Sequence, residues 1–95
     1  MSALLSMSVT VKDFDKLQQY MAKVPSTMEP YEVELLARGR VTEHLMGETN
    51  HQMEATFRFP SVESIHAWFE SSEYQRFSEI REEAADMRIT ILSPF

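Results

Sequence analysis

The chain has 95 residues, of which 43% are hydrophobic and 25% are charged, and its net charge is −6. This composition is that of a soluble globular protein, and the length predicts a single domain over residues 1–95. An acidic protein is poorly suited to bind phosphate backbones, so we expect no nucleic-acid partner. No apolar run approaches the roughly 20 residues of a membrane span, so we expect no membrane partner.

The cysteine content and the N-terminal residues bear on where the protein works. The sequence contains no cysteine, so no disulfide can form, and a cytoplasmic location is expected because that compartment is reducing. Residues 1–11 lack a basic segment followed by an unbroken apolar run, so we expect no signal peptide.

The first elements expected are a strand and a helix. Apolar and polar residues alternate over residues 4–11, which predicts a half-buried strand. Asp13 suits an N-cap, and apolar residues at spacings of three and four follow it on one helical face as far as Val24. Pro25 is expected to end this helix, because proline lacks the backbone N–H that the next turn needs.

A hairpin is expected next. Residues 31–46 are the longest extended candidate, and Gly39 within them is a place where a strand bulges or bends. Gly47 and the polar residues up to position 50 predict a turn, followed by a return strand over about residues 52–59.

The last elements expected are an interrupted helix and a final strand. Ser61 is expected to cap the helix, and after a polar interruption either Ser71 or Ser72 can cap its continuation. In that continuation Arg81 is expected on the outer side or at the flank. Residues 87–92 alternate again and predict the closing strand.

This order of elements predicts an α+β fold of the ferredoxin-like βαββαβ type, a four-stranded antiparallel sheet with helices on one face. The apolar residues of the strands occupy mainly odd positions, so odd positions are expected to face the helices. Even positions then form the other face, on which four of the six arginines are expected, namely Arg38, Arg40, Arg58 and Arg88. Two interpretations of this face stay open: cross-strand Arg–Glu pairs in solvent, or a cavity whose guanidinium groups bind a polar or anionic small molecule.

One stretch carries a family resemblance. The runs FPSVES at 59–64, Ala-Trp-Phe at 67–69 and SSEYQ at 71–75 are similar to the pattern FPS.E.a..W..SpEYq of the domain of unknown function 1330 family. The resemblance extends over about residues 5–92, although Ser72 replaces the proline of the pattern and Arg40 replaces a glycine. It implies a ferredoxin-like protomer that pairs through its sheet into a dimeric α/β barrel. It implies no reaction, so whether the protein is an enzyme stays open.

A homodimer also follows from the residues, because two sheets packed through their even faces would hide the edge strands. Such packing would take the arginines partly out of water, and each charge would then need a counter-ion or a ligand. Three functions are therefore considered: a homodimer that binds a small polar or anionic molecule, a cofactor-independent enzyme of monooxygenase or isomerase type, and a structural dimer with a salt-bridged interface.

The candidate site residues follow from these functions. Arg38 and Arg58 are expected to orient a ligand, with Trp68 as an aromatic wall, and His44 or Tyr74 are the candidates for proton transfer. The alternative for Trp68 and Tyr74 is packing in the core or the interface. No metal site is expected, because a zinc site needs converging ligands and His44 and His51, which flank the hairpin tip, are interpreted as polar loop residues. No cofactor is expected either, because a chain with two glycines lacks the glycine-rich loop of a nucleotide site.

Overall fold

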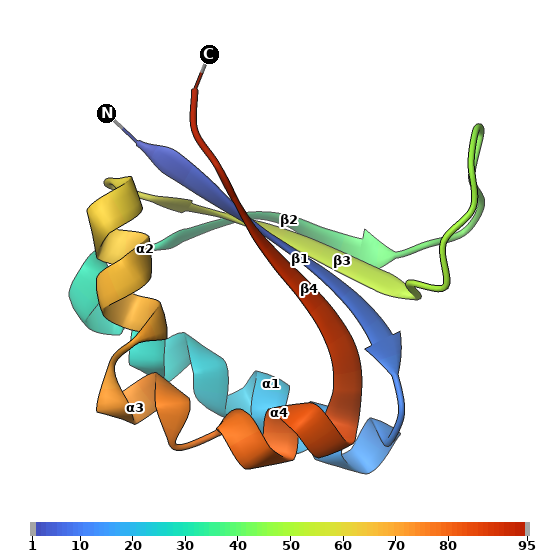
Figure 1. The fold of residues 1–95 in the computed structure, drawn as a ribbon, viewed down its shortest axis with the longest axis horizontal. Helices are drawn as coiled ribbons and strands as arrows, with labels where there is room; N and C mark the ends of the chain where they lie inside the picture. Colours follow the sequence, from blue (N-terminus) through green and yellow to red (C-terminus); the bar gives the residue numbers. More distant parts are fainter. Residues whose placement is uncertain (1, 95) are drawn as a thin grey trace.

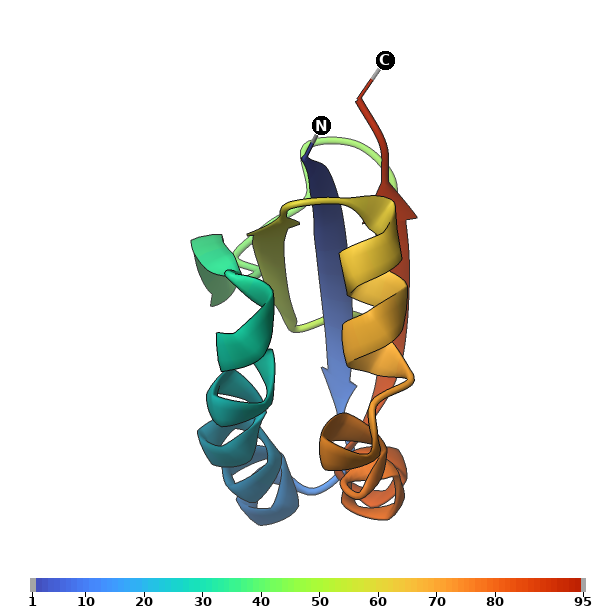
Figure 2. The ribbon, with the colours of Figure 1, turned by 90° about the vertical axis from the view of Figure 1, so that its left-hand side faces the viewer.

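The computed structural model describes residues 2–94. Its elements are β1 (Ala3–Val11), α1 (Phe14–Met28), the 3-10 turn η1 (Glu29–Tyr31), β2 (Glu34–Arg40), β3 (Met53–Phe59), α2 (Val62–Phe69), α3 (Ser72–Gln75), α4 (Ser78–Ala84) and β4 (Ala85–Leu92). The strands form one sheet in the order β2-β3-β1-β4, and all neighbouring strands are antiparallel. The helices lie together on one side of this sheet (Figures 1 and 2). The prediction of an α+β ferredoxin-like fold is confirmed.

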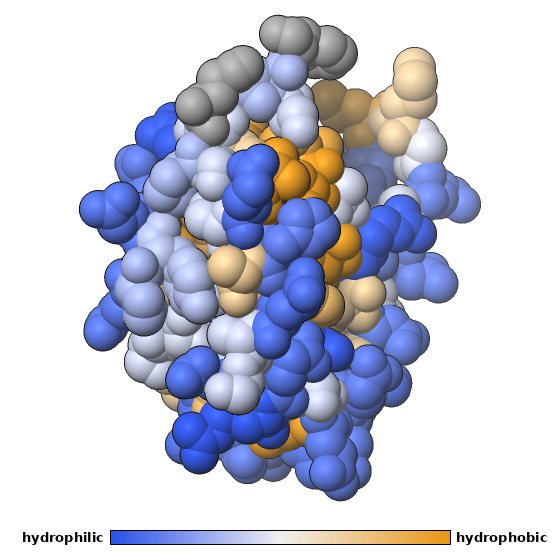
Figure 3. All heavy atoms as spheres, turned by 60° about the vertical axis from the view of Figure 1, so that its left-hand side comes forward, coloured by the Kyte–Doolittle hydropathy of each residue, from blue (hydrophilic) through white to orange (hydrophobic). Residues whose placement is uncertain are grey.

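The core lies between the sheet and the helices. The odd positions of β1 face it, and Leu5 is 1% exposed. The register aligns Leu5 with Phe57 of β3 and with Ile91 of β4, so odd positions of all three strands share this face. The predicted parity is therefore confirmed for β1, β3 and β4. The outer surface of the helix layer is mostly hydrophilic, with hydrophobic atoms visible in separate areas (Figure 3).

The edge strand β2 departs from the predicted parity. Leu35 pairs with Phe57, but Ala37 pairs with Thr56, so Leu36 is an extra residue that forms a bulge. The bulge exchanges the faces of all later residues, because side chains alternate along a strand. The predicted irregularity at Gly39 therefore occurs three residues earlier.

The first helix is longer than predicted. Asp13 caps it as expected, with its side chain accepting from the backbone N–H of Lys16 at 3.1 Å. The expected end at Pro25 is wrong, because α1 continues to Met28. The last turn is kept because Thr27 is buried against the core and its hydroxyl donates to the carbonyl of Val24 at 2.6 Å.

The predicted long second strand is also too long. Regular pairing stops at Arg40, and the segment from 41 to 52 has no helix or strand. It projects away from the helices (Figure 1). Its C-terminal end is held by Gln52, whose backbone N–H donates to the carbonyl of Val9 at 2.8 Å and whose side chain accepts from the N–H of Val11 at 2.7 Å. Gly47 has a φ of 78°, so a turn at this glycine is confirmed.

Serine caps delimit the helices of the second half. Ser61 and Ser64 form a reciprocal capping box at the start of α2, with bonds of 3.1 and 3.2 Å. Ser71, rather than Ser72, caps α3. No helix within residues 2–94 is long and apolar enough to cross a membrane.

The buried hydroxyl of Thr27 gives a first prediction. It accepts from Nε1 of Trp68 at 2.9 Å. Thr27→Val leaves that N–H without a partner, and we expect it to lower the free energy of unfolding by about 1–3 kcal/mol. Urea denaturation measures this change. Ser26→Ala is the matched control, because the Ser26 hydroxyl donates to a carbonyl at 2.9 Å on the exposed side of the same turn. It should change stability by less than about 0.5 kcal/mol, and equal losses in both variants would contradict the assigned role of the Trp68 hydrogen bond.

Candidate functional site

A buried polar contact joins α1, α3 and α4. The hydroxyls of Tyr20 and Tyr74 lie 2.6 Å apart, and the two residues are 2% and 0% exposed. Arg81 donates from Nη1 to the Tyr74 hydroxyl at 3.1 Å. The Arg81 side chain is 15% exposed, so this contact connects a largely buried charge to a phenol pair in the core.

The local sequence around Ser71 directs Tyr74 inward. The Ser71 hydroxyl accepts from the backbone N–H of Tyr74 at 3.2 Å and donates to the carbonyl of Trp68 at 2.7 Å. The Gln75 side chain donates to the carbonyl of Phe69 at 2.6 Å. These bonds satisfy backbone groups that the helix break would otherwise leave unpaired, so they hold the break in one geometry.

Trp68 belongs to the core. It is 0% exposed, and its ring lies 4.2 Å from that of Tyr74 and 5.7 Å from that of Phe59, measured between centroids. Its N–H is satisfied by Thr27. The geometry thus favours the interpretation of Trp68 as a packing residue. Trp68 contacts Tyr74 within the core and is not exposed to solvent.

A surface pocket of about 300 Å³ opens beside Arg81, between the edge strand β4 and the helices. Its lining residues are Phe69, Arg81, Glu82, Ala85, Asp86, Met87 and Ile89. The Arg81 guanidinium lies 5.5 Å from the centroid of the Tyr74 ring and 5.7 Å from that of Phe69. The pocket therefore combines one guanidinium with two carboxylates and a smaller apolar area, an arrangement that can hold a small molecule with one polar or anionic group.

Burial determines the protonation of the phenol pair. Burial raises the pKa of Tyr20 far above its ordinary value of 10.0, and the neighbouring Tyr74 raises it further, while the charge of Arg81 acts in the opposite direction. Burial is the largest single influence and disfavours the charge on Arg81. The hydrogen bond that Arg81 donates to Tyr74 and its Coulomb interactions with neighbouring groups together outweigh burial, so the pKa of Arg81 is raised. The site therefore presents a neutral Tyr20 and a charged Arg81 at neutral pH.

The family model described as "Domain of unknown function (DUF1330)" matches residues 2–95. The chain belongs to the DUF1330 family. A comparison with curated proteins finds no match. Among solved structures, a protein of unknown function from Rhodopseudomonas palustris has a TM-score of 0.85 and 15% identity, with 99% of this chain and 82% of that chain covered.

Two further structures share the fold at lower identity. SnoaB, a cofactor-independent oxygenase from Streptomyces nogalater, has a TM-score of 0.71 and 4% identity, with 99% and 93% of the two chains covered. A dabb family protein with a ferredoxin-like fold from Mesorhizobium loti has a TM-score of 0.72 and 8% identity, with 99% and 97% covered. These identities relate this DUF1330 protein to both structures by fold alone.

The DUF1330 pattern residues and the predicted ligand residues occupy different places. Tyr74 and Trp68 are in the core on the helix side. Arg58 lies on the opposite face of the sheet, where its Nη1 is 2.7 Å from Oε1 of Glu34. His44 is exposed on the projecting segment. Within one protomer these candidates therefore do not line a common cavity.

The expected position of Arg38 and Arg40 is wrong. Beyond the bulge, Arg38 pairs with Ala55 and Arg40 pairs with Met53, and cross-strand partners share a face. Met53 packs against the core, so both arginines lie on the helix side of the sheet. They are exposed there because β2 is exposed along its whole length. Only Arg58 and Arg88, instead of the four arginines expected, lie on the sheet face opposite the helices, which is called the open face below.

Sequence reasoning missed Arg81 as a site residue, because it assigned this arginine to the outside of the helix. The one available signal was its spacing of seven from Tyr74, which is about two turns of the predicted helix and puts both residues on nearly the same side of it. Within residues 2–94, no three His, Cys, Asp or Glu side chains converge as they would around a metal ion.

The raised pKa of Tyr20 predicts how stability of this DUF1330 protein depends on alkaline pH. In the unfolded chain Tyr20 ionises near pH 10, whereas in the folded protein it keeps its proton. Its contribution is thus fully present below pH 10 and is lost as the pH rises further, by up to about 1.4 kcal/mol per pH unit. Urea unfolding at about pH 8 and about pH 11 should show this loss in the wild type and a smaller one in Tyr20→Phe. Equal losses in the two proteins would contradict a neutral, buried Tyr20, since the other titrating groups are common to both.

Proposed function

We propose that the protein is a homodimer, paired through the open face of its sheet, that binds a small molecule with one polar or anionic group in the pocket beside Arg81. The observation that supports the binding site is the burial of the Arg81 side chain and the weakness of its ion pair. Its side chain is 15% exposed, while its carboxylate neighbour, Glu82, lies 3.7 Å away and is 75% exposed. A largely buried guanidinium with so weak a counter-ion favours a further acceptor in the adjoining pocket.

The chemistry of the lining restricts the class of ligand. Phe69, Met87 and Ile89 give the mainly polar lining a limited apolar area, which can contact a small aromatic or aliphatic body. Glu82 and Asp86 add negative charge at the pocket, so a ligand with several negative charges would be repelled. A monocarboxylate, a phenol or an enol fits these conditions best.

A cofactor-independent reaction is the second candidate function. The Tyr20–Tyr74 pair and Arg81 together provide a hydroxyl network held by a fixed positive charge, next to a pocket that can hold a substrate. A guanidinium in this position can stabilise negative charge that develops on an enol or a phenol oxygen. SnoaB, described as a cofactor-independent oxygenase, has the same fold, so the fold is compatible with such chemistry.

The open sheet face supports the proposed dimer. Its central row aligns Ser6 with Thr56 and with Thr90, so small hydroxyl side chains occupy the middle of the face. The next row places Glu54 and Arg88 on opposite sides of Ser8. In an isologous contact the acidic end of one row can meet the basic end of the partner's row.

The charges on this face favour a dimer interface over a ligand site. Arg58 is paired with Glu34 at 2.7 Å, so this guanidinium already has its counter-ion within the protomer. The family resemblance of the sequence, which implies a dimeric α/β barrel, supports the same assignment. The proposed ligand site therefore lies on the helix side, and the sheet face has the role of assembly.

The dimer is tested with Ser6→Arg. Ser6 lies on an inner strand at the middle of the face, and two-fold symmetry would bring two added charges together in the interface. We expect sedimentation to show a dimer for the wild type and a monomer for Ser6→Arg. Gln18→Arg adds the same charge on an exposed position of α1 and should stay dimeric. A monomeric wild type at about 10 µM, a concentration where a stable interface would be occupied, would refute the dimer.

The ligand site is tested by thermal shift with benzoate and with phenol. A ligand of the folded state raises the free energy of unfolding, by about 1.4 kcal/mol at ten times its Kd. We expect a shift in the wild type and none in Arg81→Gln. Arg88→Gln is the control, because it removes an exposed arginine from the open face and should keep the shift. Arg81→Lys retains the charge and should keep part of it. A shift of equal size in Arg81→Gln, or none in the wild type, would refute the site.

A further inference from the structure

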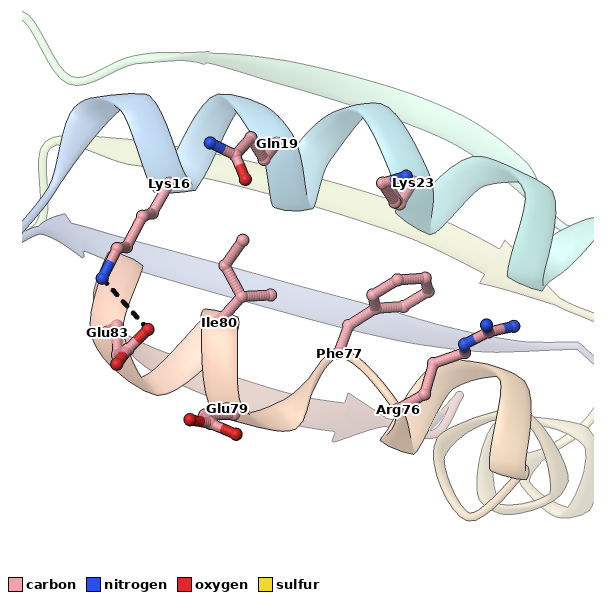
Figure 4. A pocket seen from close by; sticks show the side chains of 8 residues that line it. All are labelled: Lys16, Gln19, Lys23, Arg76, Phe77, Glu79, Ile80 and Glu83. Atoms are coloured by element: carbon pink, nitrogen blue, oxygen red, sulfur yellow. Dashed lines mark hydrogen bonds and ion pairs between the residues drawn. The ribbon is translucent and has the colours of Figure 1, made fainter.

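A second groove lies between α1 and α4, away from the pocket at Arg81. Its volume is about 390 Å³, within the range of pockets that bind small molecules, about 300–1,000 Å³. Its lining residues are Lys16, Gln19, Lys23, Arg76, Phe77, Glu79, Ile80 and Glu83 (Figure 4). None of them lines the pocket at Arg81, so the two sites can be tested separately.

Both sides of this groove are lined by side chains at helical spacing. On α1, Lys16 and Lys23 are seven residues apart, with Gln19 between them on the same face. On the other side, the apolar side chains of Phe77 and Ile80 are directed toward α1 and form the floor (Figure 4). Both are partly buried and pack against the core, so the floor is fixed by the fold.

The charges of the groove are arranged unevenly. At one end, Nζ of Lys16 lies 3.1 Å from Oε1 of Glu83, so that lysine is neutralised. At the other end, Lys23 and Arg76 make no ion pair with a carboxylate of residues 2–94. Glu79 is directed away from α1 in Figure 4. One end of the groove therefore carries two cations without a counter-ion, in a protein whose net charge is −6.

The arginine at this end is positioned over the floor. The Arg76 guanidinium carbon lies 5.6 Å from the centroid of the Phe77 ring, a cation–π contact that favours a position of this side chain beside the floor of the groove. A planar guanidinium with free N–H groups binds carboxylate, sulfonate or phosphate oxygens in a bidentate manner. The adjoining apolar floor would cover the body of the same molecule.

We propose that the α1–α4 groove binds an amphipathic organic anion, with its anionic group between Lys23 and Arg76 and its aromatic or aliphatic body over Phe77 and Ile80. This ligand differs in its anchor from that of the Arg81 pocket, and binding at the groove requires neither the proposed dimer nor the proposed ligand of that pocket. The site lies between helices, on the side of the molecule opposite the open sheet face (Figure 1).

The probe for this site is 8-anilinonaphthalene-1-sulfonate, which carries an aromatic body and one sulfonate. Amide chemical shifts of the wild type, recorded during titration, should change mainly at residues 19–23 and 76–80. The neutral analogue N-phenyl-1-naphthylamine should bind more weakly, by about tenfold, because it lacks the group that the two cations recognise. Shift changes centred on the Arg81 pocket or on the 41–52 segment, or no changes at millimolar probe, would overturn the proposal.

Substitutions at the two ends of the groove test their contributions to binding separately. The double variant Lys23→Gln, Arg76→Gln should lose about tenfold or more in affinity for the sulfonate. Lys16→Gln removes the paired lysine at the other end and should change affinity by about twofold at most. Arg81→Gln should leave the affinity unchanged, so failure at one pocket is distinguishable from failure at the other. Equal affinity in the double variant and the wild type would overturn the proposal.

Discussion

The contact between Trp68 and Tyr74 is the interaction on which the rest of this structure depends. Their ring centroids lie 4.2 Å apart, and neither residue is exposed to solvent. Each ring also carries a polar group into the core, and each polar group finds its partner on α1: the indole N–H at Thr27 and the phenol at Tyr20. The pair thereby connects α2 and α3 to α1, and Trp68 adds the contact to Phe59 of the sheet.

This packing also determines where the positive charges lie. Because the Tyr74 hydroxyl is held in the core, Arg81 reaches inward to it and leaves most of its side chain out of water. A charge in such surroundings acts more strongly on a nearby ligand than an exposed charge does. At the second groove, Lys16 is neutralised by Glu83 while Arg76 lies over Phe77. An acidic protein thus presents cations at both pockets, and its net charge is a poor guide to the ligands it takes.

The bulge at Leu36 changes which residues of β2 lie on each face of the sheet. It moves Arg38 and Arg40 to the helix side and leaves Arg58, paired with Glu34, and Arg88 on the open face. The face that remains has a central row of hydroxyl side chains, and its Arg58 is paired with Glu34. These features fit the proposed role of the face in assembly. The DUF1330 pattern, by contrast, lies in the core and at the helix break, so its residues specify the fold. They contribute to the pocket at Arg81 by fixing the core beneath it.

Much of the fold could be predicted from the sequence, because the deciding contacts are local. The cap at Ser61 depends on Ser64, three residues later, and the alternation of β1 and β4 depends on side chains that point to opposite faces at successive residues. The candidate site could be predicted only in part. Packing of Tyr74 in the core was one of two alternatives that the sequence left for this residue, whereas the role of Arg81 depends on a hydroxyl pair formed between residues 54 positions apart.

The sequence by itself thus determined the order of the strands and of the main helices, the buried face of three strands and the N-caps at Asp13 and Ser61. Tertiary structure alone decided the continuation of α1 past Pro25, the bulge at Leu36 and the inward direction of Arg81. The physical reason is the same in each case. A proline within a helix, an extra residue in an edge strand and a partly buried charge are each unfavourable locally, and each is kept because distant segments pack against it.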